Sequence, residues 1–201
     1  MRAMHAPVYA ARLRALVAAI TPHLKAGDRV LDVGCGNGTL GRALMDAAAQ
    51  DSTKAGVVAE GLERFKRGGE PITVHAYDGV KMPLADRSYD VVIVADVLHH
   101  EEDPDRLLRE CKRVSRRLVI IKDHCVEGPL AQQRISLIDW AANAPYGVKC
   151  LYRYNTPEGW TAVRERLGFK LVEERRGMNL YPPVVNTLFG GRLQYMAVLG
   201  S

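Results

Sequence analysis

Apolar residues recur at intervals of three and four over the first part of the chain and then gather in short runs. The first pattern predicts an amphipathic helix within residues 1–26, which Gly27-Asp28 ends. The later runs are separated by glycine, proline and charged residues, as strands usually are. The run at residues 90–95 is apolar throughout after Asp90, which is typical of a parallel strand with helices on both faces.

Predicted strands and helices alternate through residue 122. The strands are expected at residues 29–33, 55–59, 71–75, 90–95, 117–122, 169–174 and 193–199. The helices are expected at residues 39–49, 103–115, 131–144 and 156–168. Asp103 should cap the second of these helices, with Pro104 at its first position. The connection between the last two strands holds Tyr181-Pro182-Pro183 and Gly190-Gly191, so it is expected to be a loop. The alternation predicts an α/β, doubly wound fold.

The composition is that of a single globular domain spanning residues 1–201. The chain is 47% hydrophobic and 25% charged, which is enough apolar material for a real core. The longest uncharged apolar stretch near the N-terminus, Ala15–Ile20, is too short to cross a bilayer, and no signal-peptide layout follows it. We therefore expect a cytoplasmic protein with no membrane partner. The four cysteines form no CxxC pair, so neither a disulfide framework nor a metal site is expected.

The most informative stretch runs from Val30 to Thr39 and reads V-L-D-V-G-C-G-N-G-T. Asp32 lies in the predicted strand, and three alternating glycines follow, so the backbone can turn tightly and approach a ligand. The next helix offers free N–H groups at its start. Glu60 stands at the predicted end of the second strand, where an acid can accept hydrogen bonds from both hydroxyls of a ribose.

The glycine spacing and the first acid indicate which ligand binds at this turn. A dinucleotide fingerprint requires G-x-G-x-x-G, but counted from Gly34 its last position is Thr39, which argues against a nicotinamide-dependent oxidoreductase. Asp32 places a carboxylate at the turn, where it would repel a pyrophosphate and attract an ammonium group. S-adenosylmethionine carries an ammonium and a sulfonium group and no phosphate. A turn that only packs a helix onto the sheet would need one glycine rather than three with two spaced acids.

Together these features resemble the class I S-adenosylmethionine-dependent methyltransferases. Residues 30–38 look like the first motif of that family, and residues 84–92 and 95–100 look like its fourth strand and the loop after it. Residues 156–169 are similar to the helix that precedes its sixth strand. The resemblance spans about residues 29–175. It implies a Rossmann-like, seven-stranded, mostly parallel sheet with helices on both faces and its last strand antiparallel.

The same resemblance implies a set of residues that bind S-adenosylmethionine and its product S-adenosylhomocysteine. Glu60 matches the acid that holds the ribose, and Asp78 before Gly79 matches the residue that takes the adenine amino group. Leu98 either covers the adenine face or belongs to the core, and Cys35 serves as a small side chain within the turn. The full set is Asp32, Gly34, Cys35, Gly36, Asn37, Gly38, Glu60, Asp78, Gly79, Asp96 and Leu98.

Three histidines are candidates for a catalytic role. His99 and His100 follow the fourth predicted strand and His124 follows the fifth, so both loops open at the carboxyl edge, where α/β proteins bind ligands. One of them could remove a proton from an acceptor hydroxyl or amine, or they could pack beside the cofactor without moving a proton. The sulfonium is already activated, so we expect direct in-line displacement, in which holding the acceptor in line supplies most of the catalysis.

Residues 124–155 form a longer connection than the fold needs and are predicted to cover the acceptor. The segment carries aromatic side chains with a few polar ones between them, which is typical of small-molecule pockets. These are Trp140, Tyr146, Tyr152, Tyr154, Asp139 and Asn143. The net charge of +5 permits a nucleic-acid partner without arguing for one. A small-molecule acceptor is favoured because the basic residues between Arg106 and Arg117 are expected on a solvated helix face, and because the Asn/Asp-Pro-Pro-Tyr tetrad of amino-group base methyltransferases is absent after the fourth strand. An RNA or tRNA methyltransferase and a catalytically silent binding protein stay open as alternatives, and the pattern carries no indication of an oligomeric state.

Overall fold

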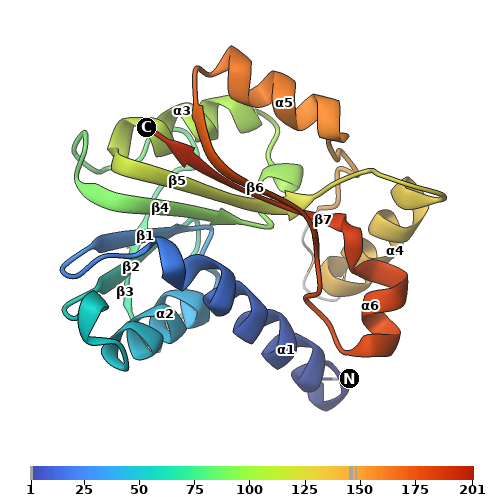
Figure 1. Cartoon of the computed structure of the whole chain (residues 1–201), viewed down its shortest axis with the longest axis horizontal. Coiled ribbons are helices and arrows are strands. Elements are labelled where there is room, and N and C mark those ends of the chain that lie inside the picture. The colour runs from blue at the N-terminus through green and yellow to red at the C-terminus, as the bar shows by residue number, and fades with distance from the viewer. Residues whose placement is uncertain (1, 145–146, 148) are drawn as a thin grey trace.

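A seven-stranded sheet in the order β3-β2-β1-β4-β5-β7-β6 forms the centre of the molecule (Figure 1). The computed structural model describes residues 2–144, 147 and 149–201, with side chains from residue 7 onward. The strands are β1 (Arg29–Val33), β2 (Val58–Glu63), β3 (Thr73–Ala76), β4 (Tyr89–Ala95), β5 (Ser115–His124), β6 (Lys170–Met178) and β7 (Gly191–Gly200). The strands from β3 to β5 pair in parallel, and β7 runs antiparallel to both of its neighbours. The predicted fold, including its antiparallel last strand, is confirmed.

Helices cover both faces of the sheet and one of its ends. They are α1 (Arg2–Ile20), α2 (Thr39–Ala49), α3 (Pro104–Val114), α4 (Ala131–Asn143), α5 (Pro157–Arg166) and α6 (Pro183–Phe189). α1 and α2 contribute Leu16 and Leu44 to the buried cluster on one face. α3 and α5 contribute Leu108 and Trp160 to the cluster on the other face. α4 and α6 lie beyond the carboxyl ends of the central strands (Figure 1), so they can cover whatever binds there.

The predicted starts of α2 and α3 are confirmed. α2 begins at Thr39 after Gly38, whose φ of 75° lies in the left-handed region that glycine tolerates. The Asp103 carboxylate accepts the backbone N–H of Arg106 at 2.9 Å, and Pro104 is the first residue of α3. The Asp103 side chain satisfies one donor that the first turn of a helix leaves open, and Pro104 removes another, which is why a short local pattern was enough to predict the start of α3.

The prediction that the second strand spans residues 55–59 and ends at Glu60 is wrong. Ala55 and Gly56 belong to a turn, in which the Ala55 carbonyl accepts the N–H of Gly27 at 2.9 Å and Gly56 has a φ of 78°. β2 therefore begins at Val58 and continues to Glu63. Glu60 lies inside the strand, opposite Leu31 of β1.

Two further boundaries differ from the sequence prediction. The connection between β6 and β7 is not all loop, because α6 occupies Pro183–Phe189. Prolines are tolerated in the first turn of a helix, since the N–H they lack would have no partner there, and the Pro182 carbonyl accepts the N–H of Asn186 at 2.8 Å. β5 extends to His124, which pairs with Gln194 of β7, so this histidine ends a strand rather than standing in a loop.

α4 and α6 are tied to each other and to the sheet. The Arg134 guanidinium of α4 donates hydrogen bonds to the carbonyls of Leu188 at 2.6 Å and Thr187 at 3.2 Å, near the end of α6. Ile135 of α4 packs with Leu193 of β7 in a small buried cluster. These contacts fix the two helices over the edge of the sheet. In the part of the chain that the structure describes, no helix is long and apolar enough to cross a membrane.

Candidate active site

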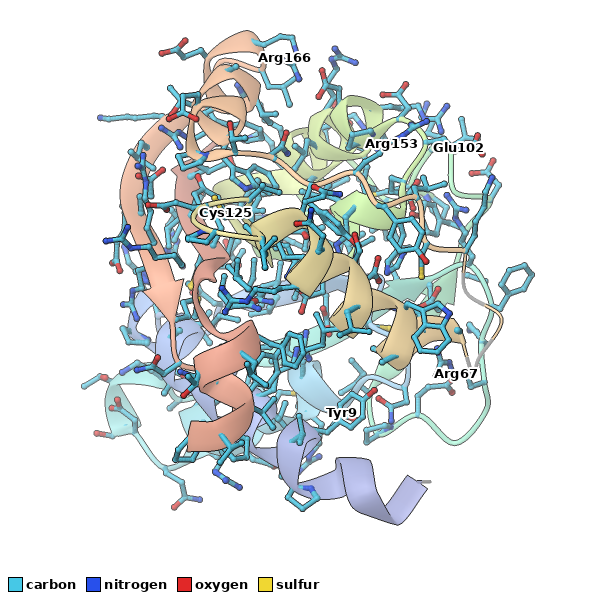
Figure 2. All side chains as sticks on the ribbon, turned by 90° about the vertical axis from the view of Figure 1, so that its right-hand side faces the viewer. Tyr9, Arg67, Glu102, Cys125, Arg153 and Arg166 are labelled. Carbon is cyan, nitrogen blue, oxygen red and sulfur yellow. The ribbon has the colours of Figure 1, made fainter. Side chains whose placement is uncertain are left out.

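A cavity of about 420 Å³ opens at the carboxyl ends of β1, β4 and β5. Figure 2 looks toward this edge of the sheet, with α4 and α6 in front and Tyr9 of α1 below α4. The glycine turn after β1 forms one wall of the cavity, and the ends of β4 and β5 together with α4 form the other. α1 contributes Tyr9 and Arg12, α6 contributes Phe189, and the connection before α6 contributes Tyr181. The predicted residues that it brings together are Asp32, Gly34, Cys35, Gly36, Asp96, His99, His100 and His124.

The glycine turn approaches its neighbours too closely for larger residues. Gly34 has a φ of 68°, and a Cβ there would lie 2.5 Å from Cγ2 of Val97 in the loop after β4. The Gly36 N–H, with a φ of 58°, donates to Oε2 of Glu63 at 2.9 Å. The Asn37 side chain accepts the Thr39 hydroxyl at 2.6 Å and so braces the turn where α2 begins. The turn therefore presents backbone, rather than side chains, to the cavity.

Asp32 is buried beneath this turn with one oxygen unsatisfied. Asp32 is only 3% exposed, and its Oδ2 has no hydrogen-bond partner among the described residues. Burial raises the pKa of Asp32 to about 7, with Glu63 raising it further and Arg12 opposing both. A buried acceptor without a donor costs folding free energy, so its persistence at a cavity wall is typical of a group that meets a ligand.

Glu60 is not near the turn, and Glu63 is. The Glu60 carboxylate contacts His75 at 2.5 Å, Tyr89 at 2.9 Å and Arg29 at 3.0 Å, partners that lie away from the cavity. Glu63 ends β2 beside Gly36, where the sequence expected an acid. Gly61-Leu62-Glu63 has the glycine–apolar–acid pattern of the family three residues later than the predicted register, and this signal was missed.

Cys35 faces the sheet rather than a reactive partner. A Cβ placed on Gly61 would lie 2.4 Å from its Sγ, so the thiol fills the space that this glycine leaves. Burial raises the pKa of the Cys35 thiol to about 12, with Asp32 and Glu63 adding to the effect. Cys35 is thus a small packing side chain and is not activated as a nucleophile.

The predicted adenine contacts lie outside the cavity. The Asp78 carboxylate accepts the N–H groups of Val80 at 2.7 Å and Lys81 at 3.1 Å. Gly79 has a φ of 83°, and a Cβ there would lie 2.5 Å from Nε of Arg64, so the arginine side chain covers this turn. Leu98 is buried within the core cluster beneath α3.

Asp96 joins three elements at the floor of the cavity. Its carboxylate accepts hydrogen bonds from Arg12 of α1 and Lys122 of β5, and its backbone has a φ of 57°. Burial alone would raise the pKa of Asp96, but the Lys122 ammonium and the Arg12 guanidinium hold it well below its usual range. Arg12 and Lys122 were not predicted as site residues. Lys122 follows the apolar run of β5, and a polar residue in that position lies at the carboxyl edge of the sheet, where ligands bind, so it could have been predicted.

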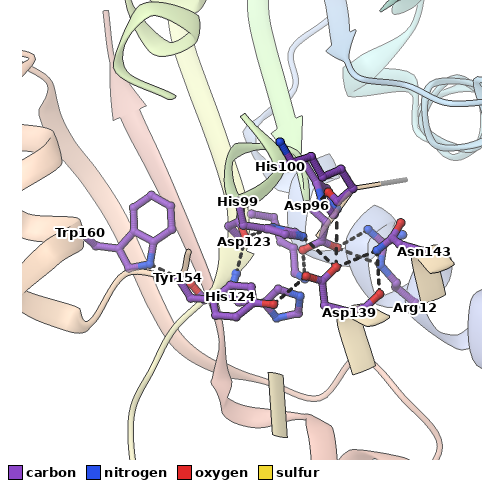
Figure 3. A network of polar contacts seen from close by, with 12 residues as sticks. Arg12, Asp96, His99, His100, Asp123, His124, Asp139, Asn143, Tyr154 and Trp160 are labelled. Carbon is purple, nitrogen blue, oxygen red and sulfur yellow. Dashed lines mark hydrogen bonds and ion pairs between the residues drawn. The ribbon is translucent and has the colours of Figure 1, made fainter. Parts of the chain in front are cut away.

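The histidines meet carboxylates that come from other elements (Figure 3). His99 Nδ1 lies 2.6 Å from the Asp123 carboxylate of β5, and its Nε2 lies 3.6 Å from Oδ1 of Asp139 in α4. Burial lowers the pKa of His99, but Asp123 and Asp139 outweigh it and raise the value to about 10. Burial lowers the pKa of His100, and it lowers that of His124 to about 4. One imidazole in this cluster is therefore charged at neutral pH and two are neutral.

The segment predicted to cover the acceptor contributes only some of the residues that were expected. Trp140 is 55% exposed, so it neither lines the cavity nor packs as core. Tyr154 donates its hydroxyl to Asp139 at 2.6 Å and, with Tyr152, lines a neighbouring cavity. Tyr146 lies outside the described residues. Asp139 and Asn143 of α4 line the cavity as expected, and α4 adds Ile138, Ala141 and Ala142.

Comparisons with known proteins identify the fold and the domain. Residues 31–120 match the family model of a methyltransferase domain. The chain is 36% identical over 113 residues to 27-O-demethylrifamycin SV methyltransferase of Amycolatopsis mediterranei, which covers 52% of this chain and 40% of that protein. It is 36% identical over 115 residues to a tRNA U34 carboxymethyltransferase of Methylococcus capsulatus, which covers 53% of this chain and 35% of that protein.

A solved S-adenosylmethionine-dependent methyltransferase of Mesorhizobium loti superposes with a TM-score of 0.67 at 18% identity, covering 93% of this chain and 98% of that one. Residues 31–120 of this chain are therefore similar to a methyltransferase domain, and the whole chain shares its fold with the solved methyltransferase of Mesorhizobium loti. The chain spans less than half the length of the two curated relatives named above.

Proposed function

We propose that this chain transfers a methyl group from S-adenosylmethionine to a small-molecule acceptor. The observation that carries the proposal is a single cavity with two unlike walls. The glycine turn on one side leaves one oxygen of the Asp32 carboxylate without a donor, and the other side offers histidines and aromatic groups. A cationic cofactor and an uncharged or weakly polar acceptor would complement these two walls.

The cofactor would bind along the glycine turn. Asp32 would accept hydrogen bonds from its ammonium group, and Glu63 would accept them from the ribose hydroxyls, while the backbone of Gly34 and Gly36 allows close approach. The adenine would lie toward Asp78-Gly79 and Leu98, as the family resemblance implies. The Arg64 side chain would have to move away from Gly79 to admit it. S-adenosylhomocysteine, the product, would occupy the same contacts.

The transfer itself would be a direct displacement. The acceptor atom forms its bond to the methyl carbon while the bond from carbon to sulfur breaks, and the sulfur takes the electron pair. Because the sulfonium is already a good leaving group, the contribution of the chain is to hold the acceptor in line. His99, His100 and His124 lie on the acceptor side and are the candidates for orienting it.

The surface charge supports a small molecule over RNA. Basic residues on α3 and at the start of β5 have partners within the chain, including Arg109 with Asp105 at 3.9 Å, Arg116 with Asp90 at 2.6 Å and Arg113 with Glu110 at 2.7 Å. A nucleic-acid surface needs cations that are available to phosphates. The rifamycin-modifying relative acts on a small molecule, whereas the tRNA relative keeps the RNA outcome in the test below.

The test begins with calorimetric titration of the purified protein at pH 8 with S-adenosylmethionine, S-adenosylhomocysteine and NADH. We expect binding of the first two only. Asp32→Asn should weaken both about 30-fold, the equivalent of ~2 kcal/mol for a hydrogen bond to a charged group. Glu60→Gln, which changes an acid outside the cavity, is the matched control and should leave affinity unchanged.

Labelled methyl transfer then distinguishes the acceptor classes. The protein is incubated with methyl-labelled cofactor and either the small-molecule fraction or the RNA fraction of a cell extract. Label in small molecules supports the proposal, and label in RNA contradicts its acceptor class. Tight cofactor binding without label in either fraction would support a silent binding protein, and binding of NADH alone would overturn the cofactor assignment.

A further inference from the structure

Two histidines and an aspartate converge at the acceptor wall of the cavity. His99 and His100 lie in the turn after β4 (Leu98–His100), and Asp139 lies in α4. Their ligating atoms, one from each side chain, are all within 4.8 Å of one another. The side chains of His99 and Asp139 are 4% and 0% exposed, whereas that of His100 is 18% exposed. Three potential ligands of one ion therefore meet at a largely buried point (Figure 3).

The spacing of these atoms fits a metal better than a hydrogen bond. Asp139 Oδ1 lies 3.6 Å from Nε2 of His99 and 3.7 Å from Nε2 of His100, both too long for a hydrogen bond. Ligands at ~2.1 Å from a tetrahedral ion lie about 3.4 Å from each other. A small inward movement would bring all three atoms to one ion.

The remaining atoms of the three side chains are already held from outside. Nδ1 of His99 contacts the Asp123 carboxylate at 2.6 Å, and Nδ1 of His100 contacts the Lys149 carbonyl at 3.2 Å. Both partners can only accept, so each Nδ1 carries a hydrogen. Nε2 of the neutral His100 ring presents its lone pair inward, and His99, which is charged without an ion, would release its Nε2 proton when a metal binds. Metal-binding histidines are usually oriented in this way, by a carboxylate or a backbone carbonyl on the second ring nitrogen.

Asp139 is oriented as well. Its Oδ2 accepts the Tyr154 hydroxyl at 2.6 Å, and its Oδ1 accepts the Asn143 amide at 2.8 Å, which directs the carboxylate toward the histidines. Because both donors are neutral, the negative charge of the Asp139 carboxylate is not compensated by them and can attract a cation.

We propose that His99, His100 and Asp139 form a binding site for one divalent transition-metal ion. Two imidazoles and one carboxylate suit zinc, iron(II), cobalt or nickel, and three protein ligands leave a coordination position open. All three residues line the cavity, so that position faces the space assigned to the acceptor. The binding site stands on its own geometry; its use in holding an acceptor oxygen rests on the proposed function.

The experiment measures metal binding directly. Protein is stripped with a chelator, passed into chelator-free buffer and titrated with Co²⁺, whose visible absorption reports nitrogen and oxygen ligands, and Zn²⁺ is then added to displace it. We expect one ion per chain. Asp139→Asn and His100→Gln should each weaken binding about 100-fold. Losing a residue that only hydrogen-bonds to a metal ligand already costs about 10- to 100-fold, so losing a ligand itself should cost at least the upper value.

The matched control is His75→Gln, which removes a histidine paired with Glu60 outside the cavity. It should bind Co²⁺ as the unmodified protein does. Far-UV circular dichroism and S-adenosylhomocysteine affinity establish that each variant is folded, and His100→Gln, the more exposed position, covers the case in which Asp139→Asn unfolds.

Three results would overturn the metal site. These are no Co²⁺ binding at 100 µM, equal loss in His75→Gln, or unchanged binding in both cluster variants. The geometry would then be an ion network in which a charged His99 lies between two carboxylates. Because S-adenosylhomocysteine binding is measured in the same samples, cofactor binding without metal binding would leave the proposed function standing, and the converse would leave only the metal site.

Discussion

Two buried aspartates, one beneath the glycine turn and one behind His99 of the acceptor wall, have pKa values that are shifted in opposite directions. Asp32, beneath the glycine turn, is 3% exposed, and Asp123, at the end of β5, is 1% exposed. Burial by itself raises the pKa of either carboxyl. It does so for Asp32, whose value rises to about 7. For Asp123 the adjacent His99 outweighs burial and holds the pKa below its usual value.

The difference follows from where each carboxylate finds its cation. Asp123 has a cation within the chain, since His99 lies 2.6 Å away. Asp32 has Arg12 nearby, but the guanidinium is engaged by Asp96. On the acceptor wall (the ends of β4 and β5 with α4), the Asp123 carboxylate is thus paired with a cation of the chain. On the glycine wall (the turn after β1), the Asp32 carboxylate has no such partner until a ligand supplies positive charge. Replacing Asp123 should therefore lower the stability of the ligand-free protein, whereas replacing Asp32 should lower the affinity for the ligand.

The largest expected effect is on the acceptor wall. Asp123→Asn leaves a buried imidazole without its counter-ion, and removing one partner of a buried pair costs about 3 kcal/mol. Urea unfolding at pH 7 measures the loss. Asp46→Asn, which changes an exposed carboxylate paired with Arg42 on α2, should alter the free energy of unfolding by less than ~0.5 kcal/mol. Equal losses in the two variants would show that Asp123 contributes no more than a surface charge.

The next largest effect is on cofactor affinity at the glycine wall. It is tested by comparing two acids of β2, Glu63 and Glu60. Glu63→Gln should weaken S-adenosylhomocysteine binding about 10-fold, because an amide retains one acceptor oxygen but loses the charge that strengthens ribose hydrogen bonds. Glu60→Gln should leave the affinity unchanged and lower stability instead, since Glu60 binds Arg29, His75 and Tyr89. Calorimetric titration measures both. The reverse order of affinities would restore Glu60 as the ribose-binding acid.

These two acids also show where sequence reasoning reaches its limit. The β1 strand, the glycine turn and α2 were predicted residue for residue because the signals are local: an apolar run, three glycines and a helical pattern. The β2 register was not, because Gly61 interrupts the apolar pattern. A glycine is tolerated inside that strand only because Cys35 occupies the space beside it, a contact between residues far apart in the sequence.

The acceptor wall depends still more on contacts between distant elements. That His99 and His124 reach the carboxyl edge could be predicted from their place after apolar strands. That Asp139 meets His99 and His100 could not, because it depends on where α4 comes to lie, and α4 is placed by Arg134 on α6, a helix that the sequence did not reveal. Trp140, one residue further along α4, consequently points outward.

The smallest expected effect is a pH dependence that belongs to Asp32 alone. The unfolded chain releases its Asp32 proton near pH 4, but the folded, ligand-free protein holds it to about pH 7. Between these values the folded state binds more protons, so stability falls as pH rises. From pH 6 to pH 8 the loss should be about 1 kcal/mol. Urea unfolding across this range measures it, and Asp32→Asn should remove this part of the slope.

Other groups titrate in the same range, so the informative quantity is the difference between the protein and the variant. The charged groups that face Asp32 are Arg12 of α1 and Glu63 of β2, and both are unchanged in Asp32→Asn. Adding S-adenosylmethionine should flatten the slope of the unmodified protein, because the ammonium group stabilises the ionised carboxylate, and it should leave the variant almost unaffected. Parallel slopes for the two proteins without ligand would show that Asp32 is ionised in the folded state, and the contrast between the two walls would then be lost.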